Sequence, residues 1–543
     1  MKITLNGTSV TANEGESVLE VALRSGVDIP HLCYHPVLPS IGACRMCLVE
    51  VEGINGFPAS CSTAVADGMV VRSDTEAVRD RQRENLELIL LEHPASCLVC
   101  YKKEACQLFR PEKEKAGTTT GCQSCSNKHD CEVQRLTVDL GVNSLPVGSF
   151  YRNVEPIRTD PFIENDPNLC ILCGRCEHIC RHHHASPVIV FTGRGPDARA
   201  GQAFDHSLSQ TGCRFCGSCV DLCPTGSLAE RFAKWYDLPE HTFETTCTFC
   251  DAACALTVME TEGRVFSAAG LDQKMPICVL GRFTIPYFLS SRDRLIHPEI
   301  VVGEVMREVS WEEAFEKASG ILEPLQGDAF AFVCDRSGTV EDRLAARTFT
   351  EEVMGSTHYI EIEDGEDPTP VKLPDGVRGV MLTGNFVDRT TLAGLDAVVL
   401  LDCFPTEAGS EATVLLPAAV LLETAGHMVD ESGTERPVVK AARAPGKAKQ
   451  DWEVICGLIS AMGNAEKSGK LADEIAARIE GSDAVVLVDR EQAPGAALDI
   501  TKIRTRYRGH VIADRVPPLR EVRTPRGATT ADELSEVSTC SEC

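Results

Sequence analysis

Cysteine residues at metal-ligand spacing crowd the first half of this 543-residue chain. Of its 27 cysteines, all but five precede residue 280. The two densest groups share the spacing CxxCxxCxxxC, which holds cubane 4Fe–4S clusters in two-cluster bacterial ferredoxins, where the fourth cysteine of each motif ligates the other cluster. The predicted ligand sets are therefore Cys170, Cys173, Cys176 and Cys223 for one cubane, and Cys180, Cys213, Cys216 and Cys219 for the other.

A third group, CxxCxxxC with a distant fourth cysteine, predicts another cubane held by Cys247, Cys250, Cys254 and Cys278. Its spacing is less specific, and structural zinc is the alternative because CxxC pairs also serve zinc. The histidines at 182–184 follow Cys180 directly. Adjacent histidines cannot easily face one ion, so we interpret this run as a polar surface stretch.

The first 75 residues have the pattern of a small ferredoxin. Ile3 and Leu5 alternate with polar residues as in a strand, and Asn6-Gly7 is a strong hairpin signal. Ser17 is placed to cap a helix that Gly26 ends. The loop that follows supplies four thiolates, which suit a 2Fe–2S cluster, with structural zinc as the alternative. The predicted ligands are Cys33, Cys44, Cys47 and Cys61.

An amphipathic helix over residues 79–91 leads into a histidine–cysteine group. His93-Pro94 stands four residues before a CxxC pair, and three cysteines are one short of a cubane. A neutral imidazole can complete such a set, and it raises the potential relative to a thiolate, as in Rieske centres. The predicted 4Fe–4S ligands are His93, Cys97, Cys100 and Cys106.

The same CxxCx5C spacing recurs at Cys122, Cys125 and Cys131, without the His-Pro lead but with His129 inside it. Three alternatives stay open for this group. It holds an extra cluster with an unidentified fourth ligand, it binds zinc, or it shares ligands with the first group. We favour an additional metal site.

Composition and charge exclude several classes of protein. The net charge of −27 argues against a nucleic-acid-binding surface. The most apolar stretch, residues 414–422, is about half a bilayer span and contains Pro417. The N-terminus alternates like a strand and lacks the apolar core of a signal peptide. So many closely spaced thiols favour metal in a reducing compartment over disulfides, so we expect a cytoplasmic protein.

The motifs, read in chain order, resemble the large iron–sulfur subunit of NADH dehydrogenase (respiratory complex I). They also resemble the iron–sulfur subunits of NAD-linked hydrogenases and formate dehydrogenases. The resemblance rests on the Cys33–Cys61 ferredoxin group, the His93-Pro94 motif, Pro161-Phe162-Ile163-Glu164 before Cys170, and the cubane motif at Cys247. Beyond residue 300 it is looser. Residues 293–314 look like the start of a molybdopterin-oxidoreductase domain, and residues 379–463 look like a later part of it.

The resemblance implies a multidomain α+β and α/β protein. Strands alternating with helices after residue 300 also favour an α/β layer with a largely parallel sheet. The expected domains are a β-grasp 2Fe–2S ferredoxin (1–75), a His/Cys cluster domain with the extra cysteine motif (76–150), a double 4Fe–4S ferredoxin (151–235), a molybdopterin-oxidoreductase-type 4Fe–4S domain (236–300), a degenerate, truncated molybdopterin-oxidoreductase-like domain (301–520) and a flexible tail (521–543) that ends in Cys540 and Cys543.

Departures from the family pattern indicate that the molybdenum site is lost. No Cys-His-Gly-Pro-like segment surrounds Cys334, Cys403 or Cys456, and only about forty residues separate Tyr359 from Ala397, where catalytic relatives insert whole subdomains. Leu280 stands where those relatives usually place a lysine between cluster and pterin. We therefore expect one 2Fe–2S and four 4Fe–4S clusters, no molybdopterin and no independent catalytic site.

The expected function is electron relay within an NADH-linked oxidoreductase complex. No convincing Gly-rich dinucleotide fingerprint is present, so we do not expect this chain to bind NAD itself. The resemblance implies as partners a flavin/NADH-binding subunit, a small thioredoxin-like 2Fe–2S subunit and a further electron acceptor or donor. No nucleic acid and no direct membrane span are expected. The alternative is a catalytic molybdenum or tungsten subunit of the formate dehydrogenase type.

Overall fold

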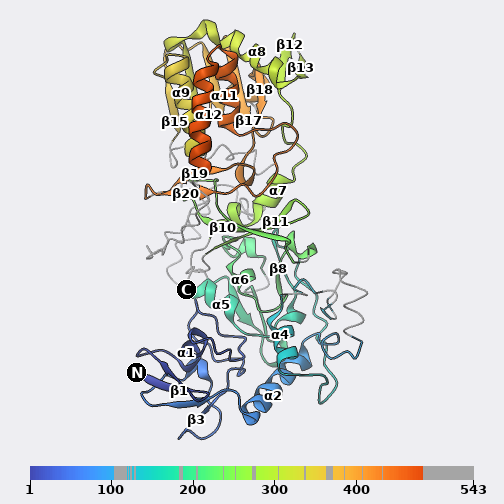
Figure 1. Ribbon diagram of the computed structural model, residues 1–543. Helices are drawn as coiled ribbons and strands as arrows, with labels where there is room; N and C mark the ends of the chain where they lie inside the picture. Colours follow the sequence, from blue (N-terminus) through green and yellow to red (C-terminus); the bar gives the residue numbers. More distant parts are fainter. Residues whose placement is uncertain are drawn as a thin grey trace, which may run out of the picture. The chain divides into compact units, whose positions relative to one another are not determined.

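The computed structural model describes most of the chain up to residue 480 (Figure 1). The described ranges are 1–102, 119, 121–122, 125–127, 130–182, 187–202, 206–236, 238–250, 252–271, 277–303, 305–335, 338–362, 371–384, 386–406, 408–430 and 432–480. Cys106, His129, His183, His184, Cys540 and Cys543 lie outside them. The chain forms two compact units that meet in sequence between Pro239 and Glu240.

Unit 1 opens with a four-stranded mixed sheet in the order β2-β1-β4-β3. Its elements are β1 (Lys2–Leu5), β2 (Thr8–Thr11), α1 (Val18–Arg24), β3 (Glu50–Val51) and β4 (Val70–Arg72). Asn6 and Gly7 have φ of 48° and 82°, which a two-residue hairpin turn requires, and so the predicted hairpin is confirmed. Ser17 forms a capping box with Glu20 at the start of α1, as its sequence position predicts.

Two helices and an apolar cluster follow the sheet. Helix α2 (Glu76–Glu92) confirms the helix predicted over residues 79–91, and α4 (Glu132–Asp139) begins directly after Cys131. Leu86 and Leu90 of α2 pack with Val133 and Leu136 of α4, and Cys44, Cys122, Cys131 and Ile171 pack against the same cluster. Segments from three predicted cluster modules therefore share one apolar core.

Short elements form the rest of unit 1. They are β5 (Ile163–Asn165), α5 (Arg175–His182), β6 (Ile189–Thr192), β7 (Arg199–Gln202), α6 (Ser218–Asp221) and β8 (Leu228–Glu230). Strand β5 pairs antiparallel with β8, and β6 pairs antiparallel with β7. Helix α5 contains Cys176 and Cys180, the third and fourth cysteines of the first CxxCxxCxxxC motif. Helix α6 contains Cys219, the third cysteine of the second motif, and ends shortly before Cys223, the fourth.

Unit 2 contains a small antiparallel sheet and a seven-stranded mixed sheet. The small sheet comprises β9 (His241–Thr246), β10 (Ala255–Thr261) and β11 (Arg264–Gly270), and α7 (Ile285–Leu289) follows it. The large sheet has the order β13-β12-β18-β17-β16-β14-β15. Its strands are β12 (Glu299–Val302), β13 (Val305–Glu308), β14 (Phe330–Asp335), β15 (Tyr359–Ile362), β16 (Gly379–Thr383), β17 (Ala397–Asp402) and β18 (Val414–Pro417).

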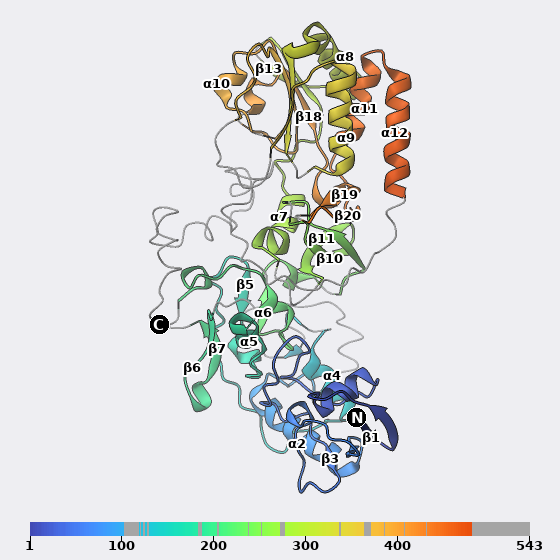
Figure 2. The ribbon, with the colours of Figure 1, turned by 90° about the vertical axis from the view of Figure 1, so that its left-hand side faces the viewer.

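The five strands from β18 to β15 are parallel, which confirms the predicted α/β layer. Helices α8 (Trp311–Leu322), α9 (Val340–Thr348), α11 (Asp451–Ala461) and α12 (Ala465–Glu480) lie on one side of the sheet, and α10 (Arg389–Leu392) lies on the other (Figure 2). A hairpin of β19 (Gly426–Val429) and β20 (Glu435–Val438) completes the described part of the unit. The inner strands β16, β17 and β18 are buried along their whole length, as expected for parallel strands covered on both faces.

One buried ion pair in unit 2 sets up a stability prediction. The Arg294 guanidinium donates to both carboxylate oxygens of Glu423, at 2.9 and 2.6 Å, and the two side chains are 1% and 2% exposed. Removing one partner leaves an uncompensated buried charge. We therefore expect Glu423→Ala to lower the free energy of unfolding of unit 2 by about 3–5 kcal/mol. Urea unfolding followed by tryptophan fluorescence measures it, because two of the three tryptophans, Trp311 and Trp452, lie in this unit.

The matched control is Asp396→Ala, which removes a pair of similar length, since Asp396 lies 2.6 Å from Arg378. Both of its side chains are more than half exposed, and such pairs contribute about 1 kcal/mol or less. Equal losses in the two variants would contradict the assignment of stability to burial of the Arg294–Glu423 pair.

Candidate iron–sulfur sites

The four cysteines of the first group converge in the loop between α1 and the end of the small sheet. The Cys44 amide donates to the Cys33 sulfur at 3.5 Å. A hydrogen bond from the Cys44 thiol lowers the pKa of Cys33 to about 5, and one from the Cys47 thiol lowers the pKa of Cys61 to about 6. Each pair thus has one sulfur that holds its negative charge readily. Thiolate is the form that binds iron, so this group fits a metal cluster.

His93 is buried in a way that fits metal ligation. It follows α2 as its C-terminal cap, and burial lowers the pKa of its ring to about 4, so that the imidazole is neutral. The ring donates a hydrogen bond to the Leu169 carbonyl, while its Nδ1 is buried without a partner among the described residues. Histidines that bind metals typically donate their other ring N–H to a carbonyl in this way. The buried Nδ1 lone pair is therefore available for iron.

Cys97, the first cysteine after His93, lies beside the second CxxCx5C group. A Cβ added at Gly121 would stand 2.7 Å from the Cys97 sulfur, so Cys97 and Cys122 are close neighbours. Burial raises the pKa of Cys122, and nearby Cys125, Cys97 and Cys131 raise it further. Cys100 accepts a hydrogen bond from the Lys102 amide at 3.4 Å. Cys97 is thus placed where it could serve either group, which accords with the alternative that the two groups share ligands.

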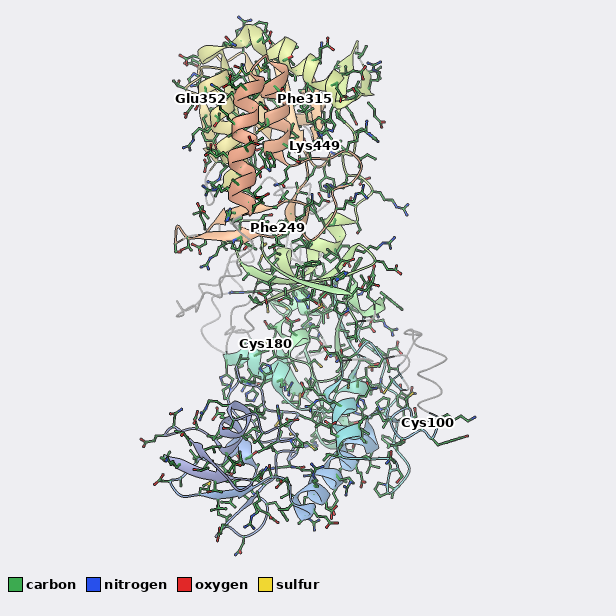
Figure 3. All side chains as sticks on the ribbon, viewed as in Figure 1. Cys100, Cys180, Phe249, Phe315, Glu352 and Lys449 are labelled. Carbon is green, nitrogen blue, oxygen red and sulfur yellow. The ribbon has the colours of Figure 1, made fainter. Side chains whose placement is uncertain are left out.

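The double ferredoxin motif lines a cavity of about 530 Å³. Four cysteines from both halves of the motif stand in its wall: Cys170, Cys173, Cys176 and Cys223. Cys180 on α5 (Figure 3) lies near the cysteines of the second CxxCxxCxxxC motif. Burial is the main cause of the raised pKa of Cys219, and the neighbouring Cys180, Cys216 and Cys213 raise it further. The structure therefore brings together the same two sets that the spacing predicts, each with one cysteine from the opposite motif.

The loops around these cysteines contain strained residues that the sequence gives no reason to expect. Leu172 and Phe215 have φ of 54° and 52° at equivalent positions, each directly before the second cysteine of its motif. Non-glycine residues in the left-handed region are uncommon and gather at functional sites. This turn directs amides toward sulfur: the Phe215 N–H donates to Cys213 at 3.4 Å. Hydrogen bonds to the sulfurs are one of the factors that set a cluster's potential.

The cysteine group of unit 2 lies between β9, β10 and the segment before α7. Burial raises the pKa of Cys247, and the neighbouring Cys254, Cys250 and Cys278 raise it further. A Cβ added at Gly281 would lie 3.4 Å from the Cys247 sulfur, so the backbone approaches the site closely there. Phe249, labelled in Figure 3, is fully buried with its ring edge-on to Phe288. All four predicted ligands of this set are thus gathered in an apolar pocket.

The three described cysteines after residue 300 lie outside the five predicted ligand sets. Cys334, Cys403 and Cys456 are buried, and Cys334 lines a cavity of about 220 Å³ at the carboxyl ends of β14 and β16. Within the described ranges, no three His, Cys, Asp or Glu side chains are close enough to hold a single metal ion. None of the helices in those ranges is both long and apolar enough to cross a membrane.

The geometry at His93 yields a test of its role as a ligand. We expect His93→Cys to retain its cluster and lower that cluster's reduction potential, because a thiolate donates more charge to iron than a neutral imidazole does. A redox titration followed by EPR on anaerobically loaded protein measures the shift. His358→Cys, at a half-buried histidine of unit 2, is the control and should change no potential. Unchanged titrations of every cluster in the His93 variant would contradict ligation.

Known proteins match this arrangement in chain order. Three family models match: a 2Fe-2S iron-sulfur cluster binding domain at residues 1–76, the ferredoxin-like domain of NADH-quinone oxidoreductase subunit 3 at 160–229, and molybdopterin oxidoreductase at 376–461. The last confirms the resemblance expected for residues 379–463.

Individual relatives point the same way. An NADH-quinone oxidoreductase subunit of Rhizobium meliloti is 32% identical over 58% of this chain and 34% of its own length. The NADP-reducing hydrogenase subunit HndD of Solidesulfovibrio fructosivorans is 33% identical over 43% of this chain and 37% of its own length. NADH-quinone oxidoreductase subunit 3 of Thermus thermophilus is 25% identical over 88% of this chain and 66% of its own length. The chain thus spans about a third of the length of the first two relatives. The chain is similar to subunits of NADH-quinone oxidoreductases, and three of its segments match the 2Fe-2S, ferredoxin-like and molybdopterin oxidoreductase family models.

Proposed function

We propose that this protein is an electron-relay subunit of a multisubunit NADH-linked oxidoreductase. It carries single electrons between a flavin/NADH-oxidising subunit and a partner redox module. The observation that carries the proposal is the exchange of cysteines in the double ferredoxin motif, where Cys223 joins the set of Cys170 and Cys180 joins the set of Cys213. This exchange ties two cluster sites into one short segment, which suits passage of electrons from one to the next.

The proposed ligands form five sets along the chain. The 2Fe–2S set lies on a β-grasp ferredoxin, which the order β2-β1-β4-β3 supports. The sets are Cys33, Cys44, Cys47 and Cys61 for 2Fe–2S; His93, Cys97, Cys100 and Cys106; Cys170, Cys173, Cys176 and Cys223; Cys180, Cys213, Cys216 and Cys219; and Cys247, Cys250, Cys254 and Cys278 for 4Fe–4S. Cys122, Cys125 and Cys131 are proposed as a further metal site.

The chain's own residues do two things for such clusters. An iron–sulfur cluster supplies one-electron chemistry, and the protein tunes it through hydrogen bonds to sulfur, burial and nearby charge. The amides of Cys44, Phe215 and Asn127 donate to sulfurs at 3.4–3.5 Å. Apolar walls such as Phe249 exclude water from the sites. The protein thus holds each cluster at a fixed position and sets how readily it takes an electron.

The proposed partners follow from the relatives and not from a surface of this chain. They are a flavin/NADH-binding subunit, a small thioredoxin-like 2Fe–2S subunit and a further electron acceptor or donor module. The density of metal-binding thiols fits a reducing compartment. We therefore propose a cytoplasmic location, with any membrane association through partners.

We further propose that residues 301–520 form a scaffold without a pterin. Strands β14, β16 and β17 bury a continuous apolar core that needs no cofactor to fill it. Only β15, β16 and α10 are described between Tyr359 and Ala397, where catalytic relatives insert subdomains. The alternative, a catalytic molybdenum or tungsten subunit of the formate dehydrogenase type, is favoured by the molybdopterin oxidoreductase match at residues 376–461.

Metal content distinguishes these proposals. We expect anaerobically purified, fully loaded protein to contain about 18 iron atoms per chain, from one 2Fe–2S and four 4Fe–4S clusters, with neither molybdenum nor tungsten. Elemental analysis together with acid-labile sulfide measures this. Iron clearly below that number would contradict the five ligand sets. Stoichiometric molybdenum or tungsten would instead favour the catalytic alternative.

Leu280 offers a second test of the scaffold proposal. Its backbone amide donates to the Cys278 sulfur, so its side chain can be changed without removing that hydrogen bond. We expect Leu280→Lys to create no formate oxidation, since the other parts of a pterin site are also missing. The assay uses the purified protein with an artificial electron acceptor, and Leu280→Met is the matched control. Formate-dependent reduction by the Lys variant, or by the unchanged protein, would contradict the scaffold proposal.

A further inference from the structure

A buried ion pair in unit 1 lies near two of the proposed cluster sites and near the proposed further metal site at Cys131. Arg175 opens α5 between Cys173 and Cys176 and is 2% exposed. Its guanidinium donates to both carboxylate oxygens of Glu132, at 2.6 and 2.9 Å, and to the Leu222 carbonyl at 3.4 Å. Its Nε is buried without a hydrogen-bond partner among the described residues. Removing the positive charge of Arg175 from water costs free energy, and this cost indicates that Arg175 has a role beyond packing.

Arg175 lies next to one proposed cluster site, and its charge influences a second. Arg175 lines the cavity that holds Cys170, Cys173, Cys176 and Cys223. The 2Fe–2S module also packs against the loop that contains Arg175. The Cδ1 atom of Ile41 lies 3.5 Å from the point where a Cβ atom would stand on Gly174, the residue before Arg175. The charge of Arg175 reaches both Cys173 and Cys33, and in each case it favours the thiolate. One cation is therefore shared by two sites.

Glu132 connects the pair to the third site. It follows Cys131 directly at the start of α4, and its amide donates to the Pro224 carbonyl, next to Cys223, at 3.1 Å. Its side chain is 32% exposed, whereas that of Arg175 is 3% exposed. The carboxylate thus partly offsets the cation from the solvent side and fixes its position.

Elementary electrostatics gives the direction of the effect. Reduction adds one negative charge to a cluster, and a nearby cation stabilises the reduced state. Resting on the proposed relay function, we propose that Arg175, held in place by Glu132, raises the reduction potentials of the 2Fe–2S cluster of Cys33, Cys44, Cys47 and Cys61 and of the cubane of Cys170, Cys173, Cys176 and Cys223 together. Arg175 is then a positioning residue for charge, common to two of the proposed relay sites.

Redox titrations followed by EPR on the full, anaerobically loaded chain test the proposal. Arg175→Gln should lower both potentials, because the cation is lost. Glu132→Gln should raise both, because the cation is no longer offset. Arg175→Lys, which keeps the charge, should shift them less than Arg175→Gln does. The cluster of Cys247, Cys250, Cys254 and Cys278 is the internal control and should not move.

Arg152→Gln is the matched control, since within the described ranges the Arg152 guanidinium donates to the carbonyls of Pro196 and Ala198 and to no carboxylate. A purely structural role would not move the potentials in opposite directions in the Arg175→Gln and Glu132→Gln variants. Unmoved potentials, or shifts of the same sign in both, would overturn the proposal. If Arg175→Gln does not fold, the sign of the Glu132→Gln shift decides. Absence of the cluster signals in the unchanged protein would instead refute the relay function itself.

Discussion

Burial of many thiol groups is the constraint on which the rest of this structure depends. Removal from water disfavours a thiolate, and burial raises the pKa of Cys170, Cys173 and Cys213 in unit 1 and of Cys247 in unit 2. Neighbouring thiolates raise these values further. Such groups accept negative charge only together with a metal cation, so binding of iron and adoption of the fold are coupled. The ligand loops are built of short strands and single helical turns because they enclose clusters and have little apolar core of their own.

The backbone around the ligands offsets part of that cost. Left-handed residues such as Leu172 and Phe215 turn the chain so that amides face the sulfurs. His93 avoids the cost altogether, because a neutral imidazole brings no charge into a buried site. Its carbonyl partner Leu169 also accepts a hydrogen bond from Thr225 at 3.0 Å, and Thr225 lies 3.7 Å from the Cys223 sulfur. A chain of polar contacts thus runs from the proposed histidine ligand to Cys223, a proposed ligand of another cluster.

The sequence allowed candidate ligand groups and a few regular elements to be predicted, for a physical reason. Metal-binding loops place their ligands at short, fixed separations, so the spacing itself carries the chemistry. The helix over residues 79–91 and the cap at Ser17 were likewise local signals. Contacts between distant segments left no such signal. Arg175 meets Glu132 across 43 positions, Cys97 lies close to Gly121, and the His93 ring meets Leu169. Nothing in a single sequence marks which arginine will be buried.

The negative net charge of the chain and the buried guanidinium of Arg175 have opposite effects on the reduction potentials of the proposed clusters. Which effect is larger depends on the distance over which each charge acts. The net charge of −27 disfavours the addition of electrons everywhere in the molecule. Those charges are mostly exposed, and salt screens exposed charges beyond about 8 Å at physiological ionic strength. A buried charge is screened far less. One guanidinium held beside Cys173 can therefore outweigh many surface carboxylates in its effect on a cluster. The potentials along such a relay then depend mainly on the few buried groups next to each site, and much less on overall composition.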